Sequence, residues 1–150
     1  ACRGYYEDLS GPAVVCHVRE IMDKVGWACE INSSLLPDDP EMLREAMEKA
    51  WEMDLVITTG GTGIGPRDNT PDIIRPMLTK EMPGIMEMIR VKYGAVNAGA
   101  LLSRAVAGVK GKTVVYTLPG SVKAVNEYMS EISKTLEHTF YMLYGTDRHK

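Results

Sequence analysis

A glycine-rich segment in the middle of the chain has the residue types of an anion-binding loop. Residues 58–68 read TTGGTGIGPRD and lie between an apolar run at 55–57 and a helix start at Pro71-Asp72. Glycine allows positive φ and lets a ligand approach the main chain, and successive backbone N–H groups near a helix N-terminus bind anions. Arg67 adds a positive charge and Asp68 a carboxylate, which suits a phosphate and a Mg²⁺-bound nucleotide. The segment predicts a site for a phosphate or another polar ligand.

The residues alone leave alternatives open for this segment. No lysine follows Gly65, so the segment is not a Walker A loop, and Gly61-Thr62-Gly63 resembles only the beginning of a dinucleotide fingerprint. A tight turn with a purely structural role is one alternative. For Asp68 the alternative is a helix cap ahead of Pro71.

The elements that must position this segment alternate between helix and strand. Apolar spacing and end signals predict helices from Pro12 to Val25 (closed by Gly26), from 40 to 51 (capped by Asp39), from Pro71, from Pro83 to Tyr93 and from Val122 to Leu143. Strands are expected at 27–36, 54–59 and 113–118, and residues 95–111 are expected to be a short helix plus irregular chain. This alternation predicts an α/β fold with three layers, in which helices cover both faces of a mostly parallel, doubly wound sheet. We expect residues 1–150 to form one domain.

Three turns that follow the expected strands should meet at one edge of the sheet. They are Pro37-Asp38, the glycine-rich segment and Pro119-Gly120-Ser121. In a parallel sheet the carboxyl ends of the strands lie at the same edge, where ligands bind. We therefore expect one composite pocket rather than a self-contained phosphate loop.

Composition excludes several classes of protein. The net charge of −3 and the pI near 5.6 argue against a broad nucleic-acid interface. No apolar run approaches the roughly 20 residues that span a membrane, and no signal peptide opens the chain, so a cytoplasmic protein without a membrane partner is expected. Cys2, Cys16 and Cys29 are an odd number without a C-x-x-C pair, which indicates reduced cysteines.

Residues 58–72 closely resemble the signature TTGGTGxxxRDxTP[DE] of the MoaB/Mog family of molybdenum cofactor biosynthesis proteins, which includes molybdopterin adenylyltransferases and the matching domain of gephyrin. Further segments resemble the family in the same order over essentially the whole chain: Tyr6–Gly11, Leu36–Asp39, Glu81–Gly84 with Glu87 and Arg90, Leu102–Arg104 and Leu118–Ser121. The sequence departs from the family pattern at Asn69, at Ile85-Met86 (usually Phe-Gly) and at Val122. The family's first buried strand, which ends in Ser-Asp, has no counterpart, and we expect that this inner strand was omitted from the sequence.

The resemblance implies adenylyl transfer from Mg·ATP to molybdopterin, which gives adenylyl-molybdopterin and pyrophosphate. It implies that Asp38 and Asp68 are the catalytic carboxylates and that they hold Mg²⁺ with the nucleotide. The residues expected to bind substrate or phosphate are Gly60, Gly61, Thr62, Gly63, Gly65, Arg67, Ser103, Pro119, Gly120 and Ser121. The resemblance also implies a homo-oligomer, usually a trimer and sometimes a hexamer, and a molybdenum-insertion protein as the downstream partner.

A second class of function stays open, a molybdopterin-binding or scaffold protein of the same fold without catalysis. The presence of both Asp38 and Asp68 favours the enzyme, because a protein that only binds has no need of paired carboxylates. Asp39, the neighbour of Asp38, is expected to act as a helix cap instead.

Overall fold

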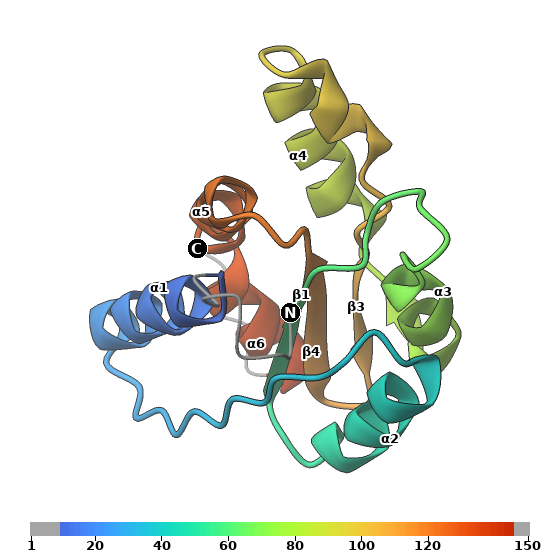
Figure 1. Cartoon of the computed structure of the whole chain (residues 1–150). Coiled ribbons are helices and arrows are strands. Elements are labelled where there is room, and N and C mark those ends of the chain that lie inside the picture. Colours follow the sequence, from blue (N-terminus) through green and yellow to red (C-terminus); the bar gives the residue numbers. More distant parts are fainter. Residues whose placement is uncertain (1–9, 146–150) are drawn as a thin grey trace.

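A computed structural model describes residues 10–145 and arranges them around a four-stranded sheet (Figure 1). The elements in chain order are α1 (Ser10–Val25), α2 (Pro40–Ala50), β1 (Leu55–Thr59), α3 (Thr70–Ile74), the 3₁₀ turn η1 (Arg75–Met77), β2 (Lys80–Glu81), α4 (Pro83–Gly94), the 3₁₀ turn η2 (Ala98–Leu102), β3 (Ala107–Lys110), β4 (Thr113–Leu118), α5 (Val122–Ile132) and α6 (Leu136–Leu143). The strand order is β1-β4-β3-β2. No helix among the described residues is both long and apolar enough to cross a membrane.

Helices cover both faces of the sheet. In Figure 1, α1, α5 and α6 lie on one side of the strands and α2 and α3 lie on the other. Strand β4 is buried along its whole length, and its side chains alternate between two hydrophobic clusters. Val114, Tyr116 and Leu118 pack in the cluster that contains residues of α1, α4, α5 and α6, whereas Val115 packs with residues of α2 and α3. The predicted three-layer α/β fold is confirmed.

The direction of the strands is mixed among the described residues rather than uniformly parallel. Strands β1 and β4 are parallel, in a register that pairs Thr59 with Leu118. Strands β3 and β4 form an antiparallel hairpin because only Gly111 and Lys112 join them, and Gly111 has the positive φ of 58° that such a tight turn needs. Strand β2 pairs antiparallel with β3. Residues 95–111 do contain the expected short helix, η2, but strand β3 was not predicted.

The strand predicted at 27–36 is wrong. These residues run as extended chain without a ladder, visible in Figure 1 between α1 and α2. A strand is defined by hydrogen bonds to a neighbour, and β1 pairs only with β4 in the described part of the chain. A groove of about 1670 Å³ lies here instead, lined by α1, by this stretch and by β1. The expected omission of the family's inner strand stays a prediction. Cys2 and Tyr6–Leu9 lie outside the described residues.

Three smaller predictions concern the ends of helices. Gly26 ends α1 with a φ of 76°, and the Asp39 carboxylate accepts a hydrogen bond from the backbone N–H of Glu41 (2.9 Å), so both predicted ends are confirmed. Helix α1 begins at Ser10, two residues before the expected start at Pro12. Cys16 and Cys29 are free and exposed.

The prediction of a single helix from Val122 to Leu143 is wrong. Helix α5 ends at Ile132, the chain turns, and helix α6 begins at Leu136. The backbone N–H of Lys134 donates to the carbonyl of Glu131 (3.1 Å), which tightens the last turn of α5. The Ser133 hydroxyl also donates to the carbonyl of Ser130 (2.8 Å), a local bond that competes with continued helix.

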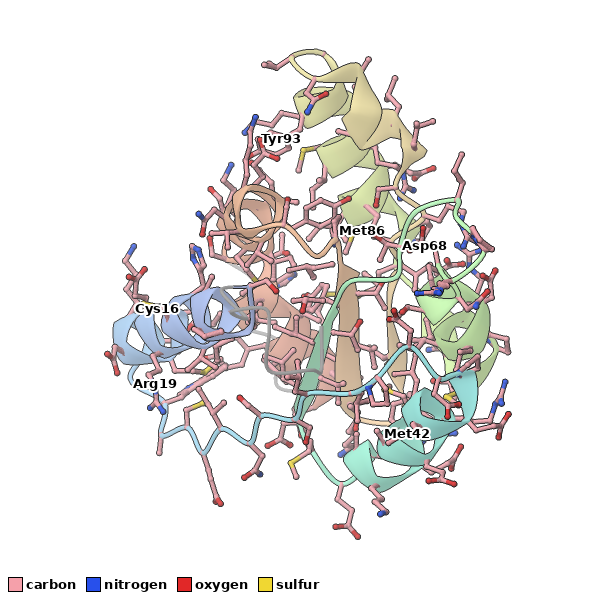
Figure 2. All side chains as sticks on the ribbon, in the orientation of Figure 1. Cys16, Arg19, Met42, Asp68, Met86 and Tyr93 are labelled. Carbon is pink, nitrogen blue, oxygen red and sulfur yellow. The ribbon has the colours of Figure 1, made fainter. Side chains whose placement is uncertain are left out.

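Glu131 forms a buried ionic network beside this turn. Its side chain is only 2% exposed, and its carboxylate accepts hydrogen bonds from Lys134 (2.8 Å), Lys92 (2.8 Å) and the Tyr93 hydroxyl (2.7 Å). These three donors lower the pKa of Glu131 to about 2, and the bond to Glu131 raises the pKa of Tyr93 to about 12. The network joins α4 to α5; Figure 2 shows Tyr93 at this junction.

The network predicts a loss of stability in acid. The folded-state pKa of Glu131 lies below the ordinary value of 4.5, so its ionised form stabilises the fold above about pH 4.5, and this contribution disappears as the pH falls toward 2. We expect Glu131→Gln to reduce the free energy of unfolding by about 2 kcal/mol at pH 7 and by much less at pH 3. Urea unfolding followed by circular dichroism measures both values, with Glu48→Gln on the exposed surface of α2 as the control. An equal loss at both pH values would contradict the prediction.

Candidate functional site

The glycine loop, residues 60–69, connects β1 to α3 and is closed at both ends by backbone hydrogen bonds. The N–H of Gly60 donates to the carbonyl of Leu118 at the end of β4 (2.8 Å), and the N–H of Thr70 donates to the carbonyl of Gly61 (3.1 Å). Gly60 and Gly61 have φ values of 93° and 73°, which side chains rarely tolerate. A β-carbon on Gly61 would also collide with the Thr70 side chain. The base of the loop therefore requires glycine.

Asp68 folds back over the loop that carries it. Its carboxylate accepts a hydrogen bond from the N–H of Gly65 (2.9 Å), and its own N–H donates to the carbonyl of Gly65 (3.0 Å). A β-carbon on Gly63 would lie 2.8 Å from the Asp68 carboxylate, and one on Gly65 would lie 2.9 Å from it. Figure 2 shows Asp68 on this loop, beside α3. The glycines thus leave room for the carboxylate.

The alternative in which Asp68 caps the helix that follows the loop is wrong. Helix α3 begins at Thr70, and its cap residue is Asn69, whose side chain makes no capping hydrogen bond. Asp68 lies one residue earlier and bonds within the loop instead.

The turn after β4 touches the glycine loop. A β-carbon on Gly120 would lie 3.3 Å from the Cα of Gly60, so the two turns are in close contact. Ser121 caps α5, because its hydroxyl oxygen accepts a hydrogen bond from the N–H of Ala124 (3.1 Å). The hydroxyl of Ser121 can still donate to a ligand. Parallel pairing of β1 with β4 produces this contact, as expected for turns at one sheet edge.

Ser103 is held firmly beside the loop. The Tyr128 hydroxyl donates to the Ser103 hydroxyl (3.0 Å), and the Ser103 oxygen also accepts from the N–H of Ala105 (3.3 Å). Arg90 donates to the backbone carbonyls of Ser103 and Ala105. Burial raises the pKa of Tyr128, which keeps it a hydrogen-bond donor at neutral pH.

The predicted site residues divide between two pockets on either side of the glycine loop. The groove of about 1670 Å³ is lined by Asp38, Gly60 and Arg67, among others. The smaller pocket, of about 370 Å³, is lined by the other predicted residues except Gly65: Thr62, Gly63, Asp68, Ser103, Pro119 and Ser121. Gly61 and Gly120 line both. The two carboxylates expected to share a metal ion, Asp38 and Asp68, therefore line different pockets.

Arg67 and Asp38 are both exposed. The backbone carbonyl of Arg67 accepts a hydrogen bond from the N–H of Asn69 (3.1 Å), but its side chain makes no hydrogen bond or ion pair with the residues that the structure describes, so its guanidinium is free for a ligand. Asp38 precedes the capping residue of α2 and faces the larger groove. Within residues 10–145 no three side chains of histidine, cysteine or acidic type form a cluster that could hold a metal ion by themselves.

Arg104 is a residue that the sequence interpretation missed. Its Nε donates to the carbonyl of Gly63 (2.8 Å), one terminal nitrogen donates to the carbonyl of Asp68, and its backbone N–H donates to the carbonyl of Thr62 (2.7 Å). Both terminal nitrogens bind the carboxylate of Asp72 (2.9 and 3.1 Å). The hydrogen bond from Arg104 lowers the pKa of Asp72, and Asp72 raises the pKa of Arg104. The signal in the sequence that could have pointed to Arg104 is its place in the Leu102-Ser103-Arg104 motif.

Comparison with known proteins gives this architecture a family. A family model described as a probable molybdopterin binding domain matches residues 2–138. The molybdopterin adenylyltransferase of Helicobacter pylori is 30% identical over 148 residues, which cover 97% of this chain and 82% of that protein. The gephyrin of Dictyostelium discoideum is 33% identical over 150 residues, but the chain spans only 21% of the length of that protein. The solved Mog protein of Mycobacterium ulcerans has a TM-score of 0.82 at 31% identity, over 97% of this chain and 92% of that chain.

The fold and these matches define a class, the α/β domains of molybdenum cofactor biosynthesis. Within that class the chain belongs to the MoaB/Mog family, as the glycine-rich signature predicted.

Proposed function

We propose that this chain transfers the adenylyl group of ATP to the terminal phosphate of molybdopterin. An oxygen of that phosphate attacks the α-phosphorus of ATP, and a new P–O bond forms. The bond between the α-phosphorus and the oxygen that bridges to the β-phosphate breaks, and pyrophosphate leaves with the electron pair. The products are adenylyl-molybdopterin and pyrophosphate.

One observation carries this proposal: Gly61 and Gly120 form a wall that borders both pockets of the site. Transfer between two phosphorylated substrates requires both to be held with their reacting groups adjacent, which accounts for much of the rate gain in such reactions. A wall of glycine backbone lets two phosphates approach closely from its two sides. The name of the Helicobacter pylori relative, molybdopterin adenylyltransferase, supports the same chemistry.

The residues present fit a Mg²⁺ ion that arrives with ATP. Mg²⁺ prefers carboxylate oxygens and is commonly held by one or two carboxylates plus substrate phosphates. Because Asp38 and Asp68 line different pockets, one of them rather than both would hold the ion. Because the described residues form no larger acidic cluster, the phosphates of the nucleotide would have to supply further ligands. The ion neutralises phosphate charge when it is bound.

The chain's own groups then act by position and charge. The amides of the glycine loop orient phosphate oxygens, and Arg67, which is free, balances their negative charge. Ser103, fixed by Tyr128, and Ser121, at the cap of α5, offer hydroxyl groups in the smaller pocket. The reaction needs no covalent intermediate on the protein.

The test is pyrophosphate release from Mg·ATP with and without molybdopterin. We expect release that depends on molybdopterin, and transfer of label from ATP labelled at the α-phosphorus onto the pterin product. Absence of release while molybdopterin still binds would overturn the enzyme and favour the alternative, a binding or scaffold member of the family.

We also propose that the chain forms a homo-oligomer, either a trimer or a hexamer, and passes its product to a molybdenum-insertion protein. The family resemblance supports both statements. Light scattering coupled to gel filtration gives the mass in solution, and a monomer at micromolar concentration would contradict the first of them.

A further inference from the structure

Arg104 lies at the centre of the bonds that shape the glycine loop. It follows η2, far from the loop in sequence, yet it binds the loop near its start, at Thr62 and Gly63, and at its end, at Asp68. Its remaining hydrogen bonds reach Asp72 in the first turn of α3. One side chain therefore connects both halves of the loop to the helix that follows it.

We infer that Arg104 is a positioning residue that holds the glycine loop in the conformation needed for adenylyl transfer. The effect of Arg104 on adenylyl transfer rests on the proposed function. Its effect on the conformation of the loop does not. Arg104 lines neither pocket, so it acts through the loop amides and the Asp68 carboxylate rather than by touching a substrate.

The loop needs such a residue because glycine is conformationally free. Four glycines lie between residues 60 and 65, and each loses more backbone entropy on ordering than any other residue type. The carbonyls of Gly63 and Asp68 accept hydrogen bonds from Arg104 and have no other hydrogen-bond partner within residues 10–145. A planar guanidinium can donate in several fixed directions at once, which a lysine ammonium cannot reproduce.

The ion pair between Arg104 and Asp72 is expected to contribute less to the order of the loop than the hydrogen bonds to the loop carbonyls. The side chains of Arg104 and Asp72 are 37% and 56% exposed, and exposed ion pairs contribute little to stability because water and salt screen them. The hydrogen bond from Nε to Gly63 involves no nitrogen that binds Asp72, whereas one terminal nitrogen donates to both Asp68 and Asp72. Loop geometry, rather than charge pairing, is therefore the expected role of Arg104, and the two can be separated by mutation.

Hydrogen exchange of the free protein tests the structural part without any ligand. We compare wild type with Arg104→Ala, Arg104→Lys and Asp72→Asn, and use Arg44→Ala as the control, because Arg44 pairs with Glu41 on the distant helix α2. We expect the hydrogen-bonded loop amides, those of Gly65, Asp68 and Asn69, to exchange at least about tenfold faster in both Arg104 variants, with a smaller change in Asp72→Asn and none in the control. Unchanged exchange in the loop would overturn the inference. Should Arg104→Ala fail to fold, Arg104→Lys decides in the same way.

Turnover tests the catalytic part. We expect Arg104→Lys and Arg104→Ala to lower kcat by about tenfold or more and also to raise the KM for ATP, because loop amides that are no longer fixed hold the phosphates less well in both the ground state and the transition state. Millimolar guanidinium, far below denaturing concentrations, should restore part of the kcat of Arg104→Ala. A raised KM for ATP with an unchanged kcat would overturn the positioning role. Faster amide exchange spread over the whole chain would overturn it as well. If wild type shows no adenylyl transfer, the proposed function fails, whereas the exchange result still decides whether Arg104 orders the loop.

Discussion

Replacing Asp68 by alanine should lower the rate of adenylyl transfer by about a hundredfold to a thousandfold, the scale seen when one preorganised polar group is removed from an active site. Asp68 places a carboxylate in the smaller pocket, and the same carboxylate accepts a hydrogen bond from the Gly65 amide. Asp68→Asn separates these two roles. Its amide oxygen can still accept from Gly65, but its negative charge is gone.

We therefore expect Asp68→Asn to keep the loop ordered and still to lose most of its turnover. Pyrophosphate release measures the rate, and hydrogen exchange of residues 62–69 measures the loop. Asp23→Asn, on the exposed surface of α1, is the matched control and should behave as wild type. Wild-type rates in Asp68→Asn would remove Asp68 from the catalytic groups. A loss of rate in Asp68→Ala alone would mean that the hydrogen bond to the loop matters more than the charge.

Placing valine at Gly63 should abolish phosphate binding at the glycine loop. A β-carbon there would lie 2.8 Å from the Asp68 carboxylate, closer than real side chains come, so the carboxylate must move, and the larger valine side chain would cover the backbone that a phosphate would approach. We expect weaker binding of ATP, measured by calorimetry, and at least about a hundredfold slower adenylyl transfer, because a misplacement of about 1 Å can cost that much in rate.

Gly84→Ala provides the control for this experiment. Gly84 lies in the first turn of α4, and an added β-carbon would meet nothing within 4 Å. Its ATP affinity should equal that of wild type. Unchanged affinity in Gly63→Val would show that the ligand does not contact this part of the backbone.

Much of the fold could be predicted because its signals are local. Strand β4 has the predicted bounds, since a continuous run of β-branched and aromatic residues leaves little choice between helix and strand. The Asp39 cap and the positive φ of Gly26 likewise depend on neighbouring residues only. The strand predicted at 27–36 depends instead on a partner strand far away in sequence. The break between α5 and α6 could not be foreseen because the apolar stripe continues through it.

The candidate site could be predicted in part for the same reason. The glycine loop and the Pro119–Ser121 turn carry their own signatures, and the parallel pairing of β1 with β4 brings them together. The Arg104 side chain has partners 32 to 41 residues away, so nothing near it in the sequence shows that it binds the loop. The same limit applies to Asp38 and Asp68. Their residue type suggested a shared metal ion, whereas only the three-dimensional arrangement shows that they line different pockets.

The glycine wall between the two pockets has a thermodynamic consequence. Gly61 and Gly120 belong to turns in close contact, so a ligand that shifts this wall from one side changes the affinity of the opposite side. Such a coupling is reciprocal: if bound nucleotide tightens the binding of pterin by some factor, bound pterin must tighten the binding of nucleotide by the same factor. The wall would thus couple the affinities of the two substrates, whichever of them binds first.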